Sequence, residues 1–226
     1  MSLSVPGCPV STHSLLLNAD YTPYKVVPWR RAVELLLDER ADLIEDYVGQ
    51  VVRSVSSSMP WPAVLRLRAF VKPRVRVRFN RQNVLARDSW VCAYCGIEPK
   101  RRDGRPRLED LTLDHVIPRA QSRDGKVQAH RSVHSDRRKI PVTCWENVVT
   151  ACSSCNSGKS DRTPEQAGLR LRIVPHAPTM TDVLRMSLRR VKVPDEWKEW
   201  LPEGAAEWGG IGSTEGDYWT VELDPD

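Results

Sequence analysis

The sequence predicts an α+β protein divided into three segments. Some stretches alternate apolar and polar residues, which favours strands, and others repeat apolar residues every three or four positions, which favours helices. Basic residues gather in the first half of the chain and acidic residues at its end. We therefore expect a small N-terminal α/β unit over residues 1–70, a second module over residues 71–166, and a C-terminal helix with an acidic tail over residues 167–226.

Length and composition limit the classes of protein that fit. A chain of 226 residues can bury a real core. It contains no run of about 18 apolar residues, so we expect no membrane partner. The N-terminus lacks a basic stretch followed by an apolar one, so we expect no secretory signal. The expected location is the cytoplasm.

The N-terminal segment reads as a scaffold or a binding unit. Residues 14–17 predict a short buried strand, and Pro28 suits the first turn of a helix. Residues 42–47 and 50–55 predict two short strands joined near Gly49, followed by a loop over residues 56–60. The helix after Pro28 has its apolar residues on one face: Trp29, Ala32, Val33, Leu36 and Leu37. No catalytic group of residues stands out in this segment.

Residues 66–107 form a basic block, with 13 Lys and Arg against three Asp and Glu, a net charge of +10. Within it, residues 74–79 alternate basic and apolar side chains, which predicts a strand with one cationic face. Guanidinium groups match phosphate oxygens, so we interpret Arg74, Arg76 and Arg78 as DNA contacts. The alternative is an exposed edge strand protected by its charge. Asn80 can cap a helix that runs to about Asp88.

Four of the six cysteines form two Cys-x-x-Cys pairs, Cys92 with Cys95 and Cys152 with Cys155. In a cytoplasmic chain this spacing favours a closed tetrahedral thiolate site for structural zinc over two disulfides. The two pairs are far apart in the sequence, so the metal would join the start and the end of one module. Cys8 and Cys144 are read as ordinary thiols.

The segment between the cysteine pairs carries an acid and an imidazole side by side. Leu111 and Leu113 alternate with polar residues, which predicts a strand that delivers Asp114 and His115 before Pro118. After the strand, one helical face is expected to collect Val148, Ala151, Cys152 and Cys155. Such a helix would turn the cysteines toward the metal and present Asn156 toward the strand, with Lys159 one turn further along.

These motifs together resemble the zinc-ribbon branch of the HNH endonucleases. The matching pattern is Cys92-x-x-Cys95, Asp114-His115-x-x-Pro118, Trp145-x-Asn147 and Cys152-x-x-Cys155-Asn156-x-x-Lys159. The front portion, from Leu15 through Trp29 to Arg53, is also similar to the N-terminal segment of stand-alone bacterial HNH proteins. The resemblance implies the ββα-metal fold, in which two strands and a helix surround one catalytic cation.

The resemblance also implies a reaction, the hydrolysis of DNA phosphodiester bonds to 5′-phosphate and 3′-hydroxyl ends. In that scheme Asp114 and Asn156 hold one Mg²⁺ or Mn²⁺, and His115 is the general base. Asn147 steadies the loop and the base histidine, while Arg119 and Lys159 are candidate phosphate contacts. Adjacent strand residues face opposite sides, so the strand must bend or end if Asp114 and His115 are to reach one phosphate.

Several alternatives are left open. The chain could be a zinc-stabilised DNA-binding module or adaptor without turnover, or a ribonuclease. Residues 119–141 are longer than the loop typical of the family and suggest an added basic substrate loop, with His130 and His134 as exposed loop histidines. Restriction, phage defence and DNA processing are equally compatible with the sequence.

The acidic tail has two interpretations. Residues 194–226 carry ten acids against one lysine, a net charge of −9, with four interspersed tryptophans, Trp197, Trp200, Trp208 and Trp219. The tail either docks onto the basic block and shields it from DNA, or docks elsewhere for stability. Besides DNA, a second copy of the chain or another protein is an open partner, through the N-terminal unit or the tail.

Overall fold

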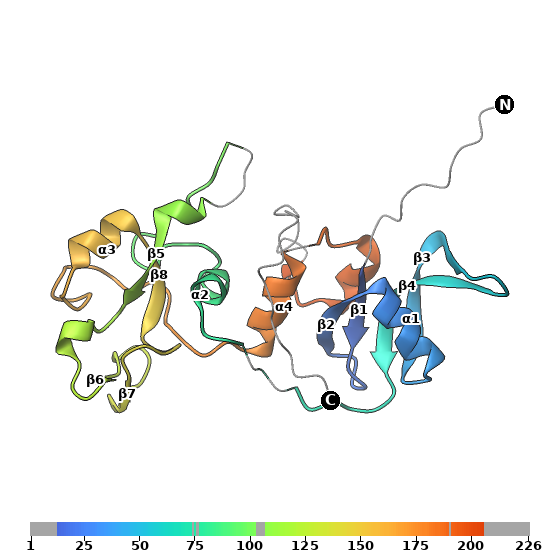
Figure 1. Ribbon diagram of the computed structural model, residues 1–226, viewed down its shortest axis with the longest axis horizontal. Coiled ribbons are helices and arrows are strands. Elements are labelled where there is room, and N and C mark those ends of the chain that lie inside the picture. Colours follow the sequence, from blue (N-terminus) through green and yellow to red (C-terminus); the bar gives the residue numbers. More distant parts are fainter. Residues whose placement is uncertain (1–12, 74, 76, 103–106, 190, 206–226) are drawn as a thin grey trace. The chain divides into compact units, whose positions relative to one another are not determined.

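The computed structural model describes residues 13–73, 75, 77–102, 107–189 and 191–205 (Figure 1). They form two units: residues 13–73 together with residues 180–205, and residues 75–179. Residues 180–205 thus join the N-terminal strands rather than forming a separate segment with residues 167–179. None of the helices in these ranges is both long and apolar enough to cross a membrane.

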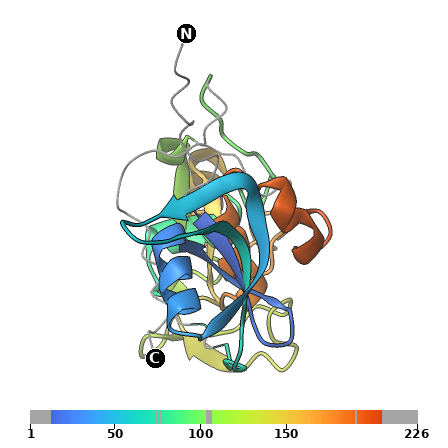
Figure 2. The same ribbon diagram turned by 90° about the vertical axis from the view of Figure 1, so that its right-hand side faces the viewer.

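The first unit is built on a four-stranded sheet with the strand order β2-β1-β4-β3. β1 and β4 are parallel, and the other two pairings are antiparallel. The strands are β1 His13–Leu17, β2 Pro23–Pro28, β3 Ala41–Arg53 and β4 Ser58–Leu67. Figure 2 turns this unit toward the viewer, with the cyan ribbons of β3 and β4 paired in a curved hairpin.

Both faces of this sheet are covered, which explains why β1 is a continuous apolar run. Leu15 and Leu17 point into one core cluster, with residues of α4 (Met180–Leu188), and Leu16 points into a second cluster, with residues of α1 (Trp29–Leu37). The two helices accordingly lie on opposite sides of the sheet (Figure 1). In α1 the buried residues are Ala32 and Leu35, whereas Leu37 of the predicted apolar face is exposed.

Two sequence expectations for this unit are wrong. Residues 41–53 form one long strand instead of two short ones, and β4 already begins at Ser58, inside the expected loop. Gly49 has a φ of +74° and lies where the register with β4 shifts, between Asp46 and Val51. The glycine therefore accommodates an irregularity within a paired strand rather than a turn between two strands.

The start of the acidic segment is docked on the sheet of the first unit. Trp197, in the 3₁₀ helix Asp195–Trp200, is fully buried, and its indole Nε1 donates to the carbonyl oxygen of Ala63 at 2.9 Å. Trp200 Nε1 donates to Glu45 at 2.6 Å. These contacts favour the stabilising role for residues 195–205, while Trp208 and Trp219 lie outside the described residues.

The second unit contains two antiparallel strands followed directly by a helix. β5 (Leu111–His115) pairs with β8 (Val148–Cys152), and α3 (Ser153–Lys159) begins at the next residue. The strand predicted for Asp114 and His115 is confirmed. The helix expected from residue 148 begins only at Ser153, because the β-branched, buried residues before it pair with β5.

The remaining elements of this unit surround that core. α2 (Arg81–Arg87) has the predicted cap, with the Asn80 side chain accepting from the Asn83 backbone N–H at 2.8 Å. A short hairpin of β6 (Lys126–Gln128) and β7 (Lys139–Pro141) lies between β5 and β8 in sequence. Single 3₁₀ turns occupy Leu108–Asp110 and Arg119–Gln121.

Within residues 74–79, where a cationic strand was predicted, the structure describes residues 75 and 77–79. None of these four residues is in a strand. Phe79 instead packs edge to face on Trp145, with ring centroids 5.1 Å apart. Side-chain packing, not strand pairing, therefore holds this stretch. Arg78 is exposed, and Arg74 and Arg76 lie outside the described residues.

Candidate active site and metal cluster

The two cysteine pairs come together as predicted. Cys92 and Cys95 follow α2, Cys152 ends β8, and Cys155 lies in the first turn of α3. The four sulfur atoms lie within 4.8 Å of one another, and the Sγ atoms of Cys95 and Cys152 are 3.8 Å apart. Zinc–sulfur bonds of about 2.3 Å in a tetrahedron require sulfur separations of roughly this size. The cluster can therefore bind a metal such as zinc.

Backbone pairing fixes the first cysteine pair on β8. Ala93, between the two cysteines, donates its N–H to the Thr150 carbonyl at 2.8 Å and accepts from the Arg172 N–H at 2.7 Å. Gly96 closes the turn with a φ of +79°, which a residue with a side chain rarely adopts. Cys92, Cys152 and Cys155 pack with Val116, Val149 and their apolar neighbours in one core cluster, whereas Cys95 is exposed.

A buried ion pair between Arg87 and Asp88 joins α2 to β8. The Arg87 guanidinium donates to the carbonyl oxygens of Val148 and Trp145, both at 2.7 Å, and the Asp88 carboxylate accepts from the Thr150 N–H at 2.7 Å. Sequence reasoning missed this pair. Its signal was an adjacent Arg and Asp directly after the apolar run of residues 84–86.

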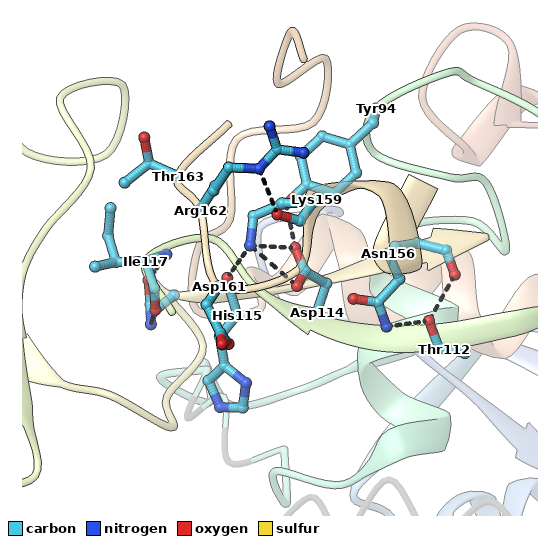
Figure 3. Close-up of polar contacts among 12 residues, drawn as sticks. Tyr94, Thr112, Asp114, His115, Ile117, Asn156, Lys159, Asp161, Arg162 and Thr163 are labelled. Carbon is cyan, nitrogen blue, oxygen red and sulfur yellow. Dashed lines mark hydrogen bonds and ion pairs between the residues drawn. The ribbon is translucent and has the colours of Figure 1, made fainter. Parts of the chain in front are cut away.

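Asp114 points toward α3 and accepts hydrogen bonds from two donor groups (Figure 3). The Tyr94 hydroxyl donates to its Oδ2 atom. The Lys159 ammonium lies 3.2 Å from Oδ1 and 3.1 Å from Oδ2, and also donates to the His115 carbonyl oxygen at 2.8 Å. The side chain of Lys159 is 0% exposed and that of Asp114 is 7% exposed. Lys159, predicted as a phosphate contact, is thus enclosed in an ion pair.

Tyr94 acts as a neutral donor in this arrangement. Burial raises the pKa of its hydroxyl well above the ordinary range, and the nearby charge of Asp114 raises it further. The hydroxyl therefore keeps its proton and can share it with the carboxylate. Because Tyr94 stands between Cys92 and Cys95, this hydrogen bond connects the metal cluster to Asp114. The sequence alone gave no signal of it.

His115 points away from Asp114, as expected for adjacent residues of a strand (Figure 3). Its Nε2 atom lies 2.9 Å from the Thr143 hydroxyl. Burial lowers the pKa of the imidazole, the positive charges of Arg119 and Lys159 lower it further, and Asp114 opposes them. The ring is therefore neutral near neutral pH and can accept a proton.

Asn147 is buried and ties together the two segments that flank His115. Its Nδ2 atom donates to the carbonyl oxygens of Ile117 and Val142, at 3.0 and 2.8 Å, and its Oδ1 atom accepts from the Ile117 N–H at 2.9 Å. The exit of β5 and the segment that carries Thr143 are thereby held in register.

Asn156 lies on the same side of β5 as Asp114. Its Nδ2 atom donates to Thr112 Oγ1 at 2.8 Å, and Thr112 and Asp114 are two residues apart on one strand face (Figure 3). The structure therefore brings Asn156 and Asp114 to one face of β5 and places His115 on the other. His115 is the last residue of β5, so the strand ends at the point where the two side chains diverge.

Residues 119–141, called the inserted lobe below, fold around a small core of their own rather than forming an open loop. Val127, Ala129 and Ile140 are buried together, against Ile117 and Val142. The expectation of exposed histidines is wrong, because each is partly buried and paired with a glutamate. His130 Nε2 lies 2.5 Å from Glu165, and His134 Nε2 lies 3.1 Å from Glu146.

The surface of the inserted lobe is cationic. Arg119, at its start, is exposed. Five more exposed cations have no ion pair with a described residue: Arg123, Lys126, Arg131, Arg137 and Lys139.

Residues 14–75 match the family described as the HNH endonuclease-associated, N-terminal domain. The chain carries an HNH endonuclease-associated domain. This domain supports an HNH endonuclease family for the chain, as the front portion of the sequence suggested, and the four-cysteine cluster is consistent with the zinc-ribbon branch of that family. A search of curated proteins and a search of solved structures each found no match.

The HNH-associated domain coincides with the sheet of the first unit, from β1 to the end of β4. Its match ends before α2, so the residues around Asp114 and His115 lie outside it. The roles of those residues therefore have to be argued from their own geometry.

Proposed function

We propose that the second unit is a DNA endonuclease of the HNH type, which hydrolyses phosphodiester bonds to 5′-phosphate and 3′-hydroxyl ends. The observation that carries this proposal is a neutral, hydrogen-bonded His115 at the end of β5, in a unit where two antiparallel strands, β5 and β8, are followed directly by the helix α3. Two strands and a helix are also the elements expected of the ββα-metal fold. The HNH-associated domain on the same chain supports it.

His115 acts as the general base. The role requires the tautomer in which the Nε2–H of the ring donates to Thr143 Oγ1, because this tautomer leaves the lone pair of Nδ1 to take a proton from the attacking water. The lowered pKa keeps that lone pair available near neutral pH. Asn147 keeps the end of β5 and the Thr143 segment in one arrangement, so the ring does not have to be ordered when the substrate binds.

The donor groups around the site fit two different metals. The four cysteines form a closed thiolate site, which suits structural zinc. Asp114 and Asn156 offer a carboxylate and an amide oxygen on one face of β5, which suits Mg²⁺ or Mn²⁺. When bound there, the divalent ion stabilises the negative charge that grows on the phosphate and the leaving oxygen.

The inserted lobe supplies the DNA-binding surface. Its unpaired cations neutralise phosphates, which provides most sequence-independent affinity for DNA. Arg119 lies at the junction of β5 and the lobe, and its charge already acts on His115. Arg74, Arg76 and Arg78 stay candidate DNA contacts on the strength of the sequence pattern alone.

The test is cleavage of supercoiled plasmid with Mg²⁺ or Mn²⁺ by the wild type, His115→Ala and His176→Ala. The side chain of His176 contacts the Val174 carbonyl, outside the site, so its removal serves as the matched control. We expect cleavage by the wild type and the control but not by His115→Ala, with DNA binding retained in all three. Equal cleavage by His115→Ala would overturn the assignment of the base.

A second candidate is a zinc-stabilised DNA-binding module or adaptor without turnover. The observation that favours it is the Lys159 ammonium, which already neutralises Asp114. In that case the wild type would bind plasmid tightly and cleave neither DNA nor RNA with any divalent ion. A ribonuclease would instead cleave RNA in the same experiment and leave the plasmid intact.

A further inference from the structure

Lys159 is a fully buried lysine whose ammonium group lies against a carboxylate. It contacts both oxygens of Asp114, at 3.2 and 3.1 Å, and the carbonyl oxygen of His115, at 2.8 Å. An ammonium group carries three N–H donors, and these three oxygens account for all of them. Such a group is tolerated in the interior because it is paired and hydrogen-bonded.

The position of this charge bears directly on the face of β5 that Asp114 and Asn156 share. Asp114 receives the Tyr94 hydroxyl and the Lys159 ammonium on the same carboxylate. A divalent ion on that carboxylate would lie within a few ångströms of a buried positive charge and repel it strongly, because water screens little at such a site. The ammonium and a metal ion are therefore alternatives at Asp114.

We propose that Lys159 is an internal counter-cation that competes with the divalent ion for Asp114. This inference rests on the proposed function, since it concerns the metal that the proposed reaction requires. Without the ion, Lys159 neutralises the carboxylate and keeps β5 joined to α3. The ion binds only when the ammonium leaves the carboxylate, so the affinity for metal is reduced by the free energy of the Lys159–Asp114 contact.

Lys159→Met removes the ammonium and keeps an unbranched side chain that is one atom shorter. The experiment measures Mn²⁺ binding by isothermal titration calorimetry on the full chain, loaded with zinc and without DNA. We expect Lys159→Met to bind Mn²⁺ about tenfold more tightly than the wild type or better, because one repelling charge is gone. An affinity equal to or weaker than that of the wild type would overturn the proposal.

A double variant tests whether the gain comes from Asp114. Lys159→Met combined with Asp114→Asn removes both charges, and the two neutral side chains keep similar shapes. We expect this variant to lose the gained affinity. If it kept the tight binding, the ion would be held elsewhere and the proposal would fail.

Loss of Lys159 leaves Asp114 buried without its cation, which destabilises the fold. The second measurement is therefore the thermal unfolding midpoint as a function of Mn²⁺ concentration. The midpoint of Lys159→Met should rise more steeply with Mn²⁺ than that of the wild type, because the ion replaces the missing charge. Equal slopes would contradict competition. If Lys159→Met does not fold, Lys159→Gln serves in both measurements, since its neutral amide can still donate to Asp114.

Neither measurement uses DNA or cleavage, so the inference and the proposed function can fail separately. Tighter Mn²⁺ binding by Lys159→Met in a protein that cleaves nothing would support the competition and refute the nuclease. Plasmid cleavage that depends on His115, with unchanged Mn²⁺ affinity in Lys159→Met, would support the nuclease and refute the competition.

Discussion

The Thr143 hydroxyl lies 2.9 Å from His115 Nε2, on the segment that Asn147 holds against the end of β5. The two residues are 28 positions apart in sequence and are separated by the whole inserted lobe. The residue that orients the proposed base therefore lies directly after the lobe, two positions beyond its last residue.

Thr143→Val should lower kcat by roughly tenfold with little change in KM, because the base is misoriented while DNA contacts remain. Thr143→Ser keeps the hydroxyl and should retain most of the rate. Steady-state cleavage of a fluorescent oligonucleotide measures both constants. A loss of rate in Thr143→Ser but not in Thr143→Val would mean that the methyl group, not the hydrogen bond, matters.

The acid limb of the pH–rate profile should lie below the ordinary histidine pKa of about 6.5. A base works when deprotonated, and burial together with the charges of Arg119 and Lys159 lowers the pKa of His115, so activity persists to lower pH. Arg119→Gln removes one of these charges and should move the limb of kcat/KM to higher pH. Arg131→Gln, an exposed cation of the same lobe, should leave it in place.

Loss of a cluster cysteine should remove zinc and stability together. Cys92→Ser or Cys155→Ser breaks the four-thiolate site, and binding of structural zinc contributes directly to the free energy of folding. Cys144→Ser is the matched control, since Cys144 lies in the same unit but outside the cluster. Metal content by mass spectrometry and thermal unfolding check both effects. Full zinc content in Cys155→Ser would contradict the four-cysteine site.

The inserted lobe should set the salt dependence of DNA binding. Changing Arg123, Lys126 and Arg131 to Ala should weaken binding and reduce the slope of log K against log salt by about two to three, at about 0.9 per lost phosphate contact. The comparison variant changes three basic residues of the first unit to Ala: Arg30, Arg31 and Arg53. Fluorescence anisotropy titrations at several salt concentrations measure the slope for the lobe variant and for the comparison variant. An equal slope in the lobe variant and the wild type would assign the lobe cations to a solvated surface.

Features encoded by neighbouring residues could be predicted from the sequence. The buried run of β1, the Asn80 cap and the four cysteines each depend on residue type and short spacing. The order of the motifs also indicated an HNH endonuclease family, which the match at residues 14–75 supports.

Features decided by distant partners could not be predicted. Val148, Ala151, Cys152 and Cys155 satisfy a helical period, but pairing with β5, more than 30 residues away, makes the first three strand residues. In the sequence, Lys159 resembles an exposed phosphate contact. Only the structure shows that it pairs with Asp114, 45 positions earlier. Gly49 signals a turn locally, and only the partner strand β4 shows it to lie within β3.

The burial of Trp197 against Ala63 has a consequence for biosynthesis. The first unit is discontinuous, because its core needs α4 and Trp197 as well as the first four strands. A ribosome releases the chain from the N-terminus, so residues 75–179 emerge and can fold while the first unit still lacks its last pieces. Closing that unit requires contacts more than 130 residues apart, which slows folding. In a nascent chain truncated before residue 197, protease should accordingly cleave the N-terminal sheet, while the second unit, residues 75–179, is already protected.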